Sequence, residues 1–286
     1  MKKSVVLFSA FLLFVSSSVS GVEWPQEEHN SDSIVSYFAQ NIGGRMSTSI
    51  IFADPAEVKA VKEGKVLIVM SDDDDDTDFF PSALGTSVII AHDDELISVY
   101  SNLDSETVNE KSDTIKEGEI IGSTGNSGWQ EKRSSLNFQI IDIQKSSAIN
   151  PKILLPRTEN EKDYNLSGIV IQGKDGVYYD LKERKQFPSG TYKVYHSRNK
   201  VAAPYKITAT INGVVLDELS FDTIGEQNGK LYITGKKQYT SVDLYPDSDL
   251  ILSGEIMLTP GKFTLGLSVE NFLGKTKQAT YILSIY

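Results

Sequence analysis

The strongest constraint on the fold is a succession of short runs rich in β-branched and aromatic residues, each closed by turn-forming residues. Three examples are TSVIIAH, which ends at His92, LISVYSNL, which ends at Leu103, and KFTLGLSVEN, which starts at Lys262. In the third run apolar and polar residues alternate, as expected for a strand with one face in a core. No long segment with helical periodicity competes with these runs. The sequence therefore predicts an all-β protein.

The length of 286 residues is typical of about two domains. A natural boundary lies at RTENEKDYN, residues 157–165, because this stretch is charged and holds no aliphatic residue. We therefore expect a first β domain over residues 22–156, a linker at 157–165 and a second β domain over 166–286. About nine short runs in the second part favour an antiparallel β-sandwich of the immunoglobulin-like type.

Residues 1–21 have the pattern of a secretory signal peptide. Lys2 and Lys3 precede an apolar run from Val5 to Val15, and small residues follow it. A helix of that length spans roughly half of the ~30 Å hydrocarbon core, so it is too short to be a membrane anchor. We expect an exported protein, periplasmic or secreted, without a membrane span.

Charge and residue content exclude several classes of function. The formal net charge is −11, from 28 Lys+Arg and 39 Asp+Glu, which argues against a nucleic-acid partner. The absence of Cys excludes disulfides, thiolate metal sites and a nucleophilic cysteine. The chain has three histidines, His29, His92 and His196.

Between Gly43 and Pro156 the chain resembles the lysostaphin/LytM-type zinc endopeptidases that cut peptidoglycan cross-bridges. The similar phrases, in order along the chain, are DPAEVKAVKEGKV, TSVIIAH, LISVYSNL, IKEGEIIGSTGNSG, SLNFQI and NPKILLP. The resemblance implies a LytM-type antiparallel β domain. It also implies a zinc ion held by two His and one Asp, with two further His that assist catalysis.

Residue by residue, this chain departs from the family at every functional position. The family's first ligand pair, H-x-x-x-D, falls at Ser47 and Ile51, and the histidine of Y-x-H-L falls at Asn102. The two histidines of H-L-H-F fall at Ser135 and Asn137. Hydroxyl and amide groups are poor zinc ligands, and an isoleucine side chain offers no lone pair. We therefore predict no cofactor, with zinc absent, and a non-enzymatic protein whose vestigial groove is lined by these five residues.

Two neighbouring features have structural interpretations. The glycines Gly122, Gly125 and Gly128 are predicted to supply positive φ angles in a tight loop that brings the next strand alongside. His92 matches a family histidine that is not a ligand and precedes a turn, so we interpret it as structural.

A run of five aspartates extends from Asp72 to Asp76. It is typical of a solvated loop, and calcium binding is left open because calcium loops usually interleave their ligands with turn residues. The adjacent segment Phe79, Phe80 and Pro81 is a candidate cover for the groove.

The leading functional hypothesis is a non-catalytic, exported LytM-like pseudopeptidase that regulates or scaffolds cell-wall hydrolysis. Its expected partners are a peptidoglycan peptide, a cell-wall hydrolase or another envelope protein. An alternative is a structural or adhesive exported β-sandwich protein, and a third is an active peptidoglycan metallo-endopeptidase. Binding to peptidoglycan sacculi and to envelope hydrolases would distinguish them.

Overall fold

The computed structural model describes residues 22–27, 29–53, 55–71, 82–106, 114–128, 134–158 and 161–286. The expected signal peptide, the acidic run at 72–76 and the segment at 79–81 lie outside these residues. Within the described ranges, no helix is both long and apolar enough to cross a membrane.

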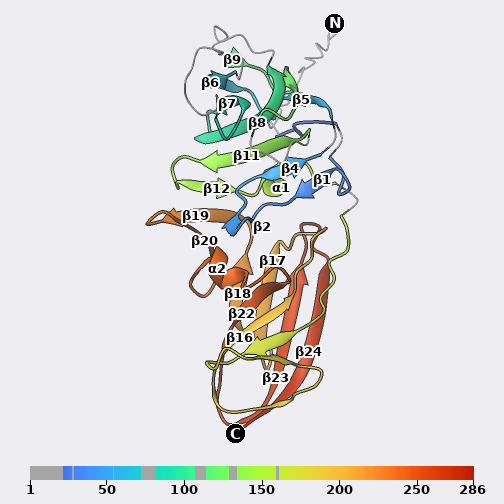
Figure 1. Ribbon diagram of the computed structural model, residues 1–286, viewed down its shortest axis with the longest axis vertical. Coiled ribbons are helices and arrows are strands. Elements are labelled where there is room, and N and C mark those ends of the chain that lie inside the picture. The colour runs from blue at the N-terminus through green and yellow to red at the C-terminus, as the bar shows by residue number, and fades with distance from the viewer. Residues whose placement is uncertain are drawn as a thin grey trace, which may run out of the picture.

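The first half of the chain folds into short strands and one helical turn (Figure 1). The elements in chain order are β1 (Ile34–Ser36), β2 (Asn41–Ile42), β3 (Arg45–Met46), β4 (Ile50–Phe52), β5 (Glu57–Lys59), β6 (Gly64–Met70), β7 (Thr86–Ala91), β8 (Leu96–Glu106), β9 (Thr114–Ile115), β10 (Ile120–Thr124), β11 (Leu136–Asp142), β12 (Ser147–Ile149) and α1 (Pro151–Leu154).

Strand β11 organises the sheet of this half. One of its edges pairs with β8, while β4 and β12 share the other edge, β4 at its start and β12 at its end. Its residues alternate between buried and partly exposed, so Leu136, Phe138 and Ile140 enter the core while Asn137 and Gln139 face the other way. The ring of Phe138 lies 5.2 Å from that of the buried Tyr100 on β8.

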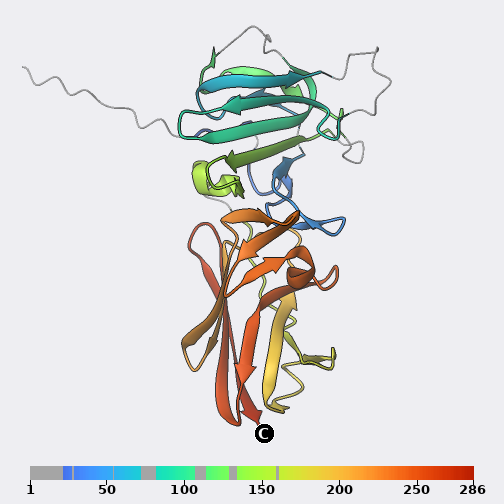
Figure 2. The same cartoon turned by 90° about the vertical axis from the view of Figure 1, so that its left-hand side faces the viewer.

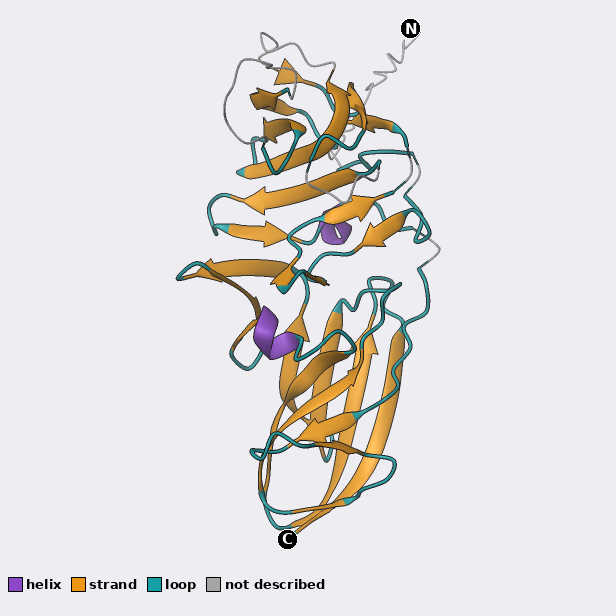
Figure 3. Cartoon of the chain, in the orientation of Figure 1, coloured by secondary structure: helices purple, strands orange, loops and turns teal. Residues whose placement is uncertain are grey.

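The second half contains the remaining strands and one further helical turn (Figures 1 and 3). They are β13 (Val170–Gln172), β14 (Tyr178–Asp180), β15 (Gln186–Phe187), β16 (Gly190–Ser197), β17 (Lys206–Ile211), β18 (Val214–Ser220), β19 (Thr223–Gln227), β20 (Lys230–Thr234), β21 (Gln238–Thr240), α2 (Ser241–Leu244), β22 (Leu250–Leu258), β23 (Gly261–Glu270) and β24 (Thr276–Ile285).

Most of these strands form a β-sandwich (Figure 2). One sheet has the order β14-β13-β16-β22 and the other has the order β15-β24-β23-β17-β18. Ile171, Val194 and Ile256 of the first sheet pack in one core with Leu265 and Leu283 of the second. All pairs in both sheets are antiparallel except β15 with β24. The prediction of an all-β protein built from antiparallel sheets is confirmed.

Three strands of the second half leave the sandwich and extend the sheet of the first half. Strand β19 pairs with β12, with Ala148 opposite Ile224, and β20 and β21 continue the sheet outward. Both halves therefore share one hydrogen-bonded sheet. The division into residues 22–156 and 166–286 stays a prediction about folding units, and the structure adds this connection between them.

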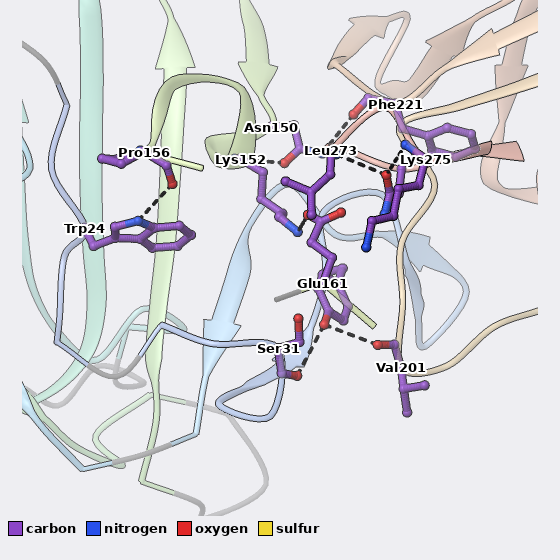
Figure 4. A network of polar contacts seen from close by, with 12 residues as sticks. Trp24, Ser31, Asn150, Lys152, Pro156, Glu161, Val201, Phe221, Leu273 and Lys275 are labelled. Carbon is purple, nitrogen blue, oxygen red and sulfur yellow. Dashed lines mark hydrogen bonds and ion pairs between the residues drawn. The ribbon is translucent and has the colours of Figure 1, made fainter. Parts of the chain in front are cut away.

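Side-chain contacts reinforce the junction of the two halves (Figure 4). Asn150 Nδ2 donates to Phe221 O over 2.9 Å. Lys152 forms an ion pair with Glu161, and the two side chains are only 10% and 6% exposed. Tyr164 is also buried, and its hydroxyl lies 2.8 Å from His196 Nε2. The segment 157–165 was expected to bury almost nothing, and this is wrong at Glu161 and Tyr164, because an ion pair and a ring contact draw them inward.

Candidate functional site

Three of the five predicted groove residues lie in one depression of about 260 Å³. Strand pairing explains this, because Asn137 of β11 is directly opposite Ile51 of β4. Ser47 follows β3 and lines the same depression, together with Arg45 and Met46 and their neighbours Ile42, Thr48 and Ser49. The sequence positions inferred from the resemblance are therefore neighbours in space.

The polar groups of this depression are only partly paired. Ser47 Oγ donates to Ser49 O over 3.0 Å, and Gln139 Nε2 donates to Thr48 Oγ1 over 3.1 Å. Asn137 Oδ1 is buried and accepts no hydrogen bond from the residues that the structure describes. An unpaired buried polar atom costs about 1–3 kcal/mol, so this oxygen is a ready acceptor for a ligand donor.

Asn102 and Ser135 do not line the depression, so the prediction of five residues on one surface is wrong at these two. Asn102 is fully buried with φ 67°. Its Nδ2 lies 2.7 Å from Gly125 O and 2.8 Å from Ser135 O, while its Oδ1 accepts from Gly128 N over 2.8 Å. These bonds connect Asn102 on β8 to the loop at 125–128 and to Ser135. The amide group already bonds to these backbone groups, so it is not available to a ligand.

The three glycines that were expected to have positive φ, Gly122 on β10 and Gly125 and Gly128 in this loop, also differ from expectation. Gly122, Gly125 and Gly128 are not among the residues with positive φ. A Cβ at Gly125 would lie 2.1 Å from Asp104 N, so glycine is needed there because two backbones approach closely.

The side chains in the depression do not fit a zinc ion. A hydroxyl, an alkyl chain and a carboxamide occupy the positions that the resemblance assigns to two His and one Asp. Among the described residues, no group of three or more His, Cys, Asp or Glu could hold a metal. The absence of zinc itself stays a prediction.

The histidines have other roles in the structure. His92 lies with Nδ1 2.8 Å from Glu63 O and Nε2 2.9 Å from Ser98 Oγ, and burial lowers its pKa. These contacts fit the structural role expected for it. His29 stacks on Trp24 with ring centroids 4.5 Å apart. His196 is fully buried, and desolvation lowers its pKa to about 3.

The depression adjoins a larger groove of about 670 Å³ that lies between the two halves. Arg45 and Met46 belong to both, and the far wall comes from β19, β20 and α2, including Leu231 and Val242. Ser241 Oγ in this wall is buried and makes no hydrogen bond with any part of the chain that is described. Sequence reasoning missed these residues because nothing in the local pattern brings residues 226–243 next to the β2–β3 hairpin.

Comparison with known proteins identifies the type of the first half. Residues 45–151 match the model of Peptidase family M23, and residues 163–286 match a second family model that carries no description. No curated protein matches the chain. The predicted resemblance to LytM-type endopeptidases is confirmed, and residues 45–151 form an M23-like domain.

Several solved structures match this chain, with low sequence identities and low TM-scores. SpoIIQ in the SpoIIQ–SpoIIIAH pore-forming complex is 22% identical, with 50% of this chain and 95% of that chain covered and a TM-score of 0.39. The catalytic domain of the M23 protein EnpA from Enterococcus faecalis is 23% identical, with coverages of 41% and 87% and a TM-score of 0.34. Lysostaphin is 16% identical, with coverages of 93% and 92% and a TM-score of 0.36. At TM-scores this low, the likeness says nothing about shared activity.

Proposed function

We propose that this chain is an exported, non-catalytic M23-like protein that binds a peptide segment of the cell envelope, in peptidoglycan or in an envelope protein, and so regulates or scaffolds cell-wall hydrolysis. The observation that carries the proposal is Asn137 Oδ1, a buried and unpaired acceptor at a position where the peptidase family has a zinc ligand. A bound N–H group would satisfy it.

The chemistry of the depression supports binding without cleavage. Metallopeptidases activate a water molecule on zinc and use nearby acid or base groups. Ser47, Ile51 and Asn137 provide neither a charged ligand nor a titratable group at neutral pH. His92 and His196 are buried in other contacts.

The adjoining groove supports an extended ligand rather than a compact one. It continues from the depression past Arg45 and Met46 and reaches Val242, which is 81% exposed. Its lining carries charges of both signs, from Arg45 and Lys230 and from Glu226 and Asp243. A peptide backbone with donors for Asn137 Oδ1 and Ser241 Oγ, and with apolar side chains beside Val242, suits this lining.

Binding to purified sacculi and to purified envelope hydrolases tests the proposal. Asn137→Leu replaces the acceptor by an apolar group of similar size and is expected to weaken binding by about tenfold. Val242→Asp tests the far wall of the groove in the same way. Asn126→Leu is the matched control, because Asn126 is exposed and lies outside both cavities.

The control is expected to bind like the parent protein, and all three variants to keep their melting temperatures within a few degrees. Equal binding by folded Asn137→Leu and Val242→Asp would exclude the depression and the groove as the binding surface. Peptide release from sacculi that a chelator abolishes would exclude the non-catalytic interpretation.

A further inference from the structure

A separate cavity of about 300 Å³ is lined by residues of the β-sandwich, including the C-terminal residue Tyr286. Figure 1 shows the C-terminus at the end of the sandwich that lies away from the M23-like half. Its walls come from the turn at 173–175, from Tyr179 on β14 and from the segment around β15 and the start of β16. Tyr286 closes one side and is 68% exposed. The cavity shares no residue with the depression or the groove described above.

Arg184 is held in a fixed orientation at this cavity. Its Nε donates to Gln186 O over 2.9 Å. The guanidinium carbon lies 4.3 Å from the ring centroid of Tyr179 and 5.1 Å from that of Phe187. The side chain also interacts with the Tyr179 hydroxyl. A guanidinium has five N–H donors, so donors in its plane remain for an acceptor in the cavity.

Neither Arg184 nor Lys174 forms a direct ion pair among the described residues, and Arg184 interacts with Asp175 only through the electrostatic attraction that helps to lower the pKa of this carboxyl. Asp175 is the carboxylate side chain in the lining, and it is already engaged. Its Oδ2 accepts from Tyr179 OH over 2.7 Å and its Oδ1 accepts from Val177 N over 3.1 Å. Asp175 therefore fixes Tyr179, which in turn supports Arg184.

We propose that this cavity binds a compact organic carboxylate, with Arg184 donating paired N–H bonds to it and Lys174 adding a second positive charge. A planar, preoriented guanidinium matches the two oxygens of a carboxylate. The exposed ring of Tyr286 offers an apolar wall to the rest of the ligand. Ser189 and Thr191 also line the cavity and supply hydroxyl groups for the polar groups of the ligand.

Tyr286 is the exposed aromatic residue of the lining, and the other three rings, those of Tyr179, Phe187 and Tyr192, do not favour a sugar as the ligand. Stacking on a sugar needs exposed ring faces, whereas Phe187 is fully buried and Tyr192 is 5% exposed. The guanidinium of Arg184 already covers Tyr179. The rings therefore act mainly as supports for the cation.

A pair of probes that differ only in charge tests the proposal. N-acetylglycine carries the carboxylate, and N-acetylglycinamide replaces it by a neutral amide. Each is titrated into the full-length mature protein while the backbone amide signals of Gly173 and Thr191 are followed by NMR. The acid is expected to shift these signals in a saturable way, and the amide to bind at least about tenfold more weakly.

Variants assign the effect to the cavity. Arg184→Gln is expected to weaken binding of the acid by about tenfold or more, and Lys174→Gln by less. Arg184→Lys keeps the charge but loses the planar fork, so its affinity for the acid is expected to lie between that of Arg184→Gln and that of the parent protein. Lys182→Gln removes an exposed cation of the same region that does not line the cavity, and is expected to bind normally.

The proposal is overturned if acid and amide bind equally, if no saturable shift occurs, or if folded Arg184→Gln binds like the parent protein. If Arg184→Gln does not fold, Arg184→Lys and Lys174→Gln decide in the same way. Asn137→Leu leaves this binding unchanged if the two sites are independent, so the result does not depend on the function proposed for the M23-like half.

Discussion

At the scale of single residues, Asn102 has a structural role at a position where the peptidase family has a catalytic histidine: its side chain bonds to three backbone groups. Its left-handed backbone and buried amide hold the loop at 125–128 against β8. Asn102→Ala would remove the bonds from Nδ2 to Gly125 O and Ser135 O and the acceptor of Gly128 N. We expect a loss of about 3 kcal/mol in the free energy of unfolding, measured by urea denaturation.

The comparison for this experiment is Asn126→Ala, which removes an exposed amide and is expected to change stability by less than about 0.5 kcal/mol. A similar stability for the two variants would mean that the bonds of Asn102 are replaced by others.

The depression gives a second prediction, about metal. The parent protein is expected to retain no stoichiometric zinc after dialysis, measured by elemental analysis. The cross-strand register of Ile51 and Asn137 also predicts that the site can be rebuilt. The combined variant Ser47→His, Ile51→Asp and Asn137→His is expected to bind about one zinc per chain. Zinc in the parent protein, or none in this variant, would show that these positions are wrongly aligned.

His196 makes stability depend on pH. It is buried between Tyr164 OH and Ser253 Oγ, and its pKa falls from 6.5 to about 3 in the folded state. The unfolded chain therefore binds a proton more readily, so stability is full above pH 6.5 and falls as the pH decreases toward 3. The slope from this residue is about 1.4 kcal/mol per pH unit.

This slope is measured as the free energy of unfolding between pH 6.5 and 3. His196→Gln is expected to be less stable at neutral pH but to lose less stability on acidification, because it removes the titrating group. His29→Gln provides the comparison, since His29 is only partly buried beside Trp24. Parallel pH profiles for His196→Gln and the parent protein would contradict the assignment.

Among the secondary-structure elements, the pairing of β12 with β19 decides how the halves behave. Limited proteolysis within 157–165 is expected to cut the chain without separating its parts. The ladder, the Asn150 to Phe221 bond and the bond from the Tyr245 hydroxyl to Ala39 O would still join them. Size-exclusion chromatography of the nicked protein is expected to give a single peak of unchanged volume.

Ile224→Ala tests the same ladder from within, since Ile224 is 1% exposed and packs at the junction. Its loss creates a cavity that costs about 2–5 kcal/mol, and the nicked variant is expected to separate more readily. Ile282→Ala is the control, because Ile282 is 66% exposed on the sandwich. Separation of the nicked parent protein without any mutation would favour independent domains.

Individual strands could be predicted from the sequence, but their pairing partners could not. The alternation in KFTLGLSVEN identified β23, because one face of this strand is buried locally. The partner of a strand is not contained in such a pattern. The second part of the chain, residues 166–286, was expected to form the sandwich, yet β19 to β21 join the first sheet through contacts between residues about 75 positions apart.

The same limit applies to the site. The positions of Ser47, Ile51 and Asn137 followed from a resemblance, and their placement in one depression agrees with it. The fate of Asn102 could not be predicted, because its burial depends on Gly125 and Gly128 approaching from another loop. Arg184 was not singled out either, because its stacking on Tyr179 and Phe187 exists only after folding.

For the whole molecule, the shared sheet means that the second half covers a sheet edge of the first half. Removal of the second half would leave Ser147, Ala148 and Ile149 of β12 with unpaired main-chain groups at an open sheet edge. Such edges recruit strands from other chains. Residues 22–158 produced alone are therefore expected to self-associate, measured by light scattering. The substitution Ala148→Pro in this fragment is expected to suppress the association. In the intact chain, the pairing of β12 with β19 therefore both joins the halves and prevents aggregation through this sheet edge.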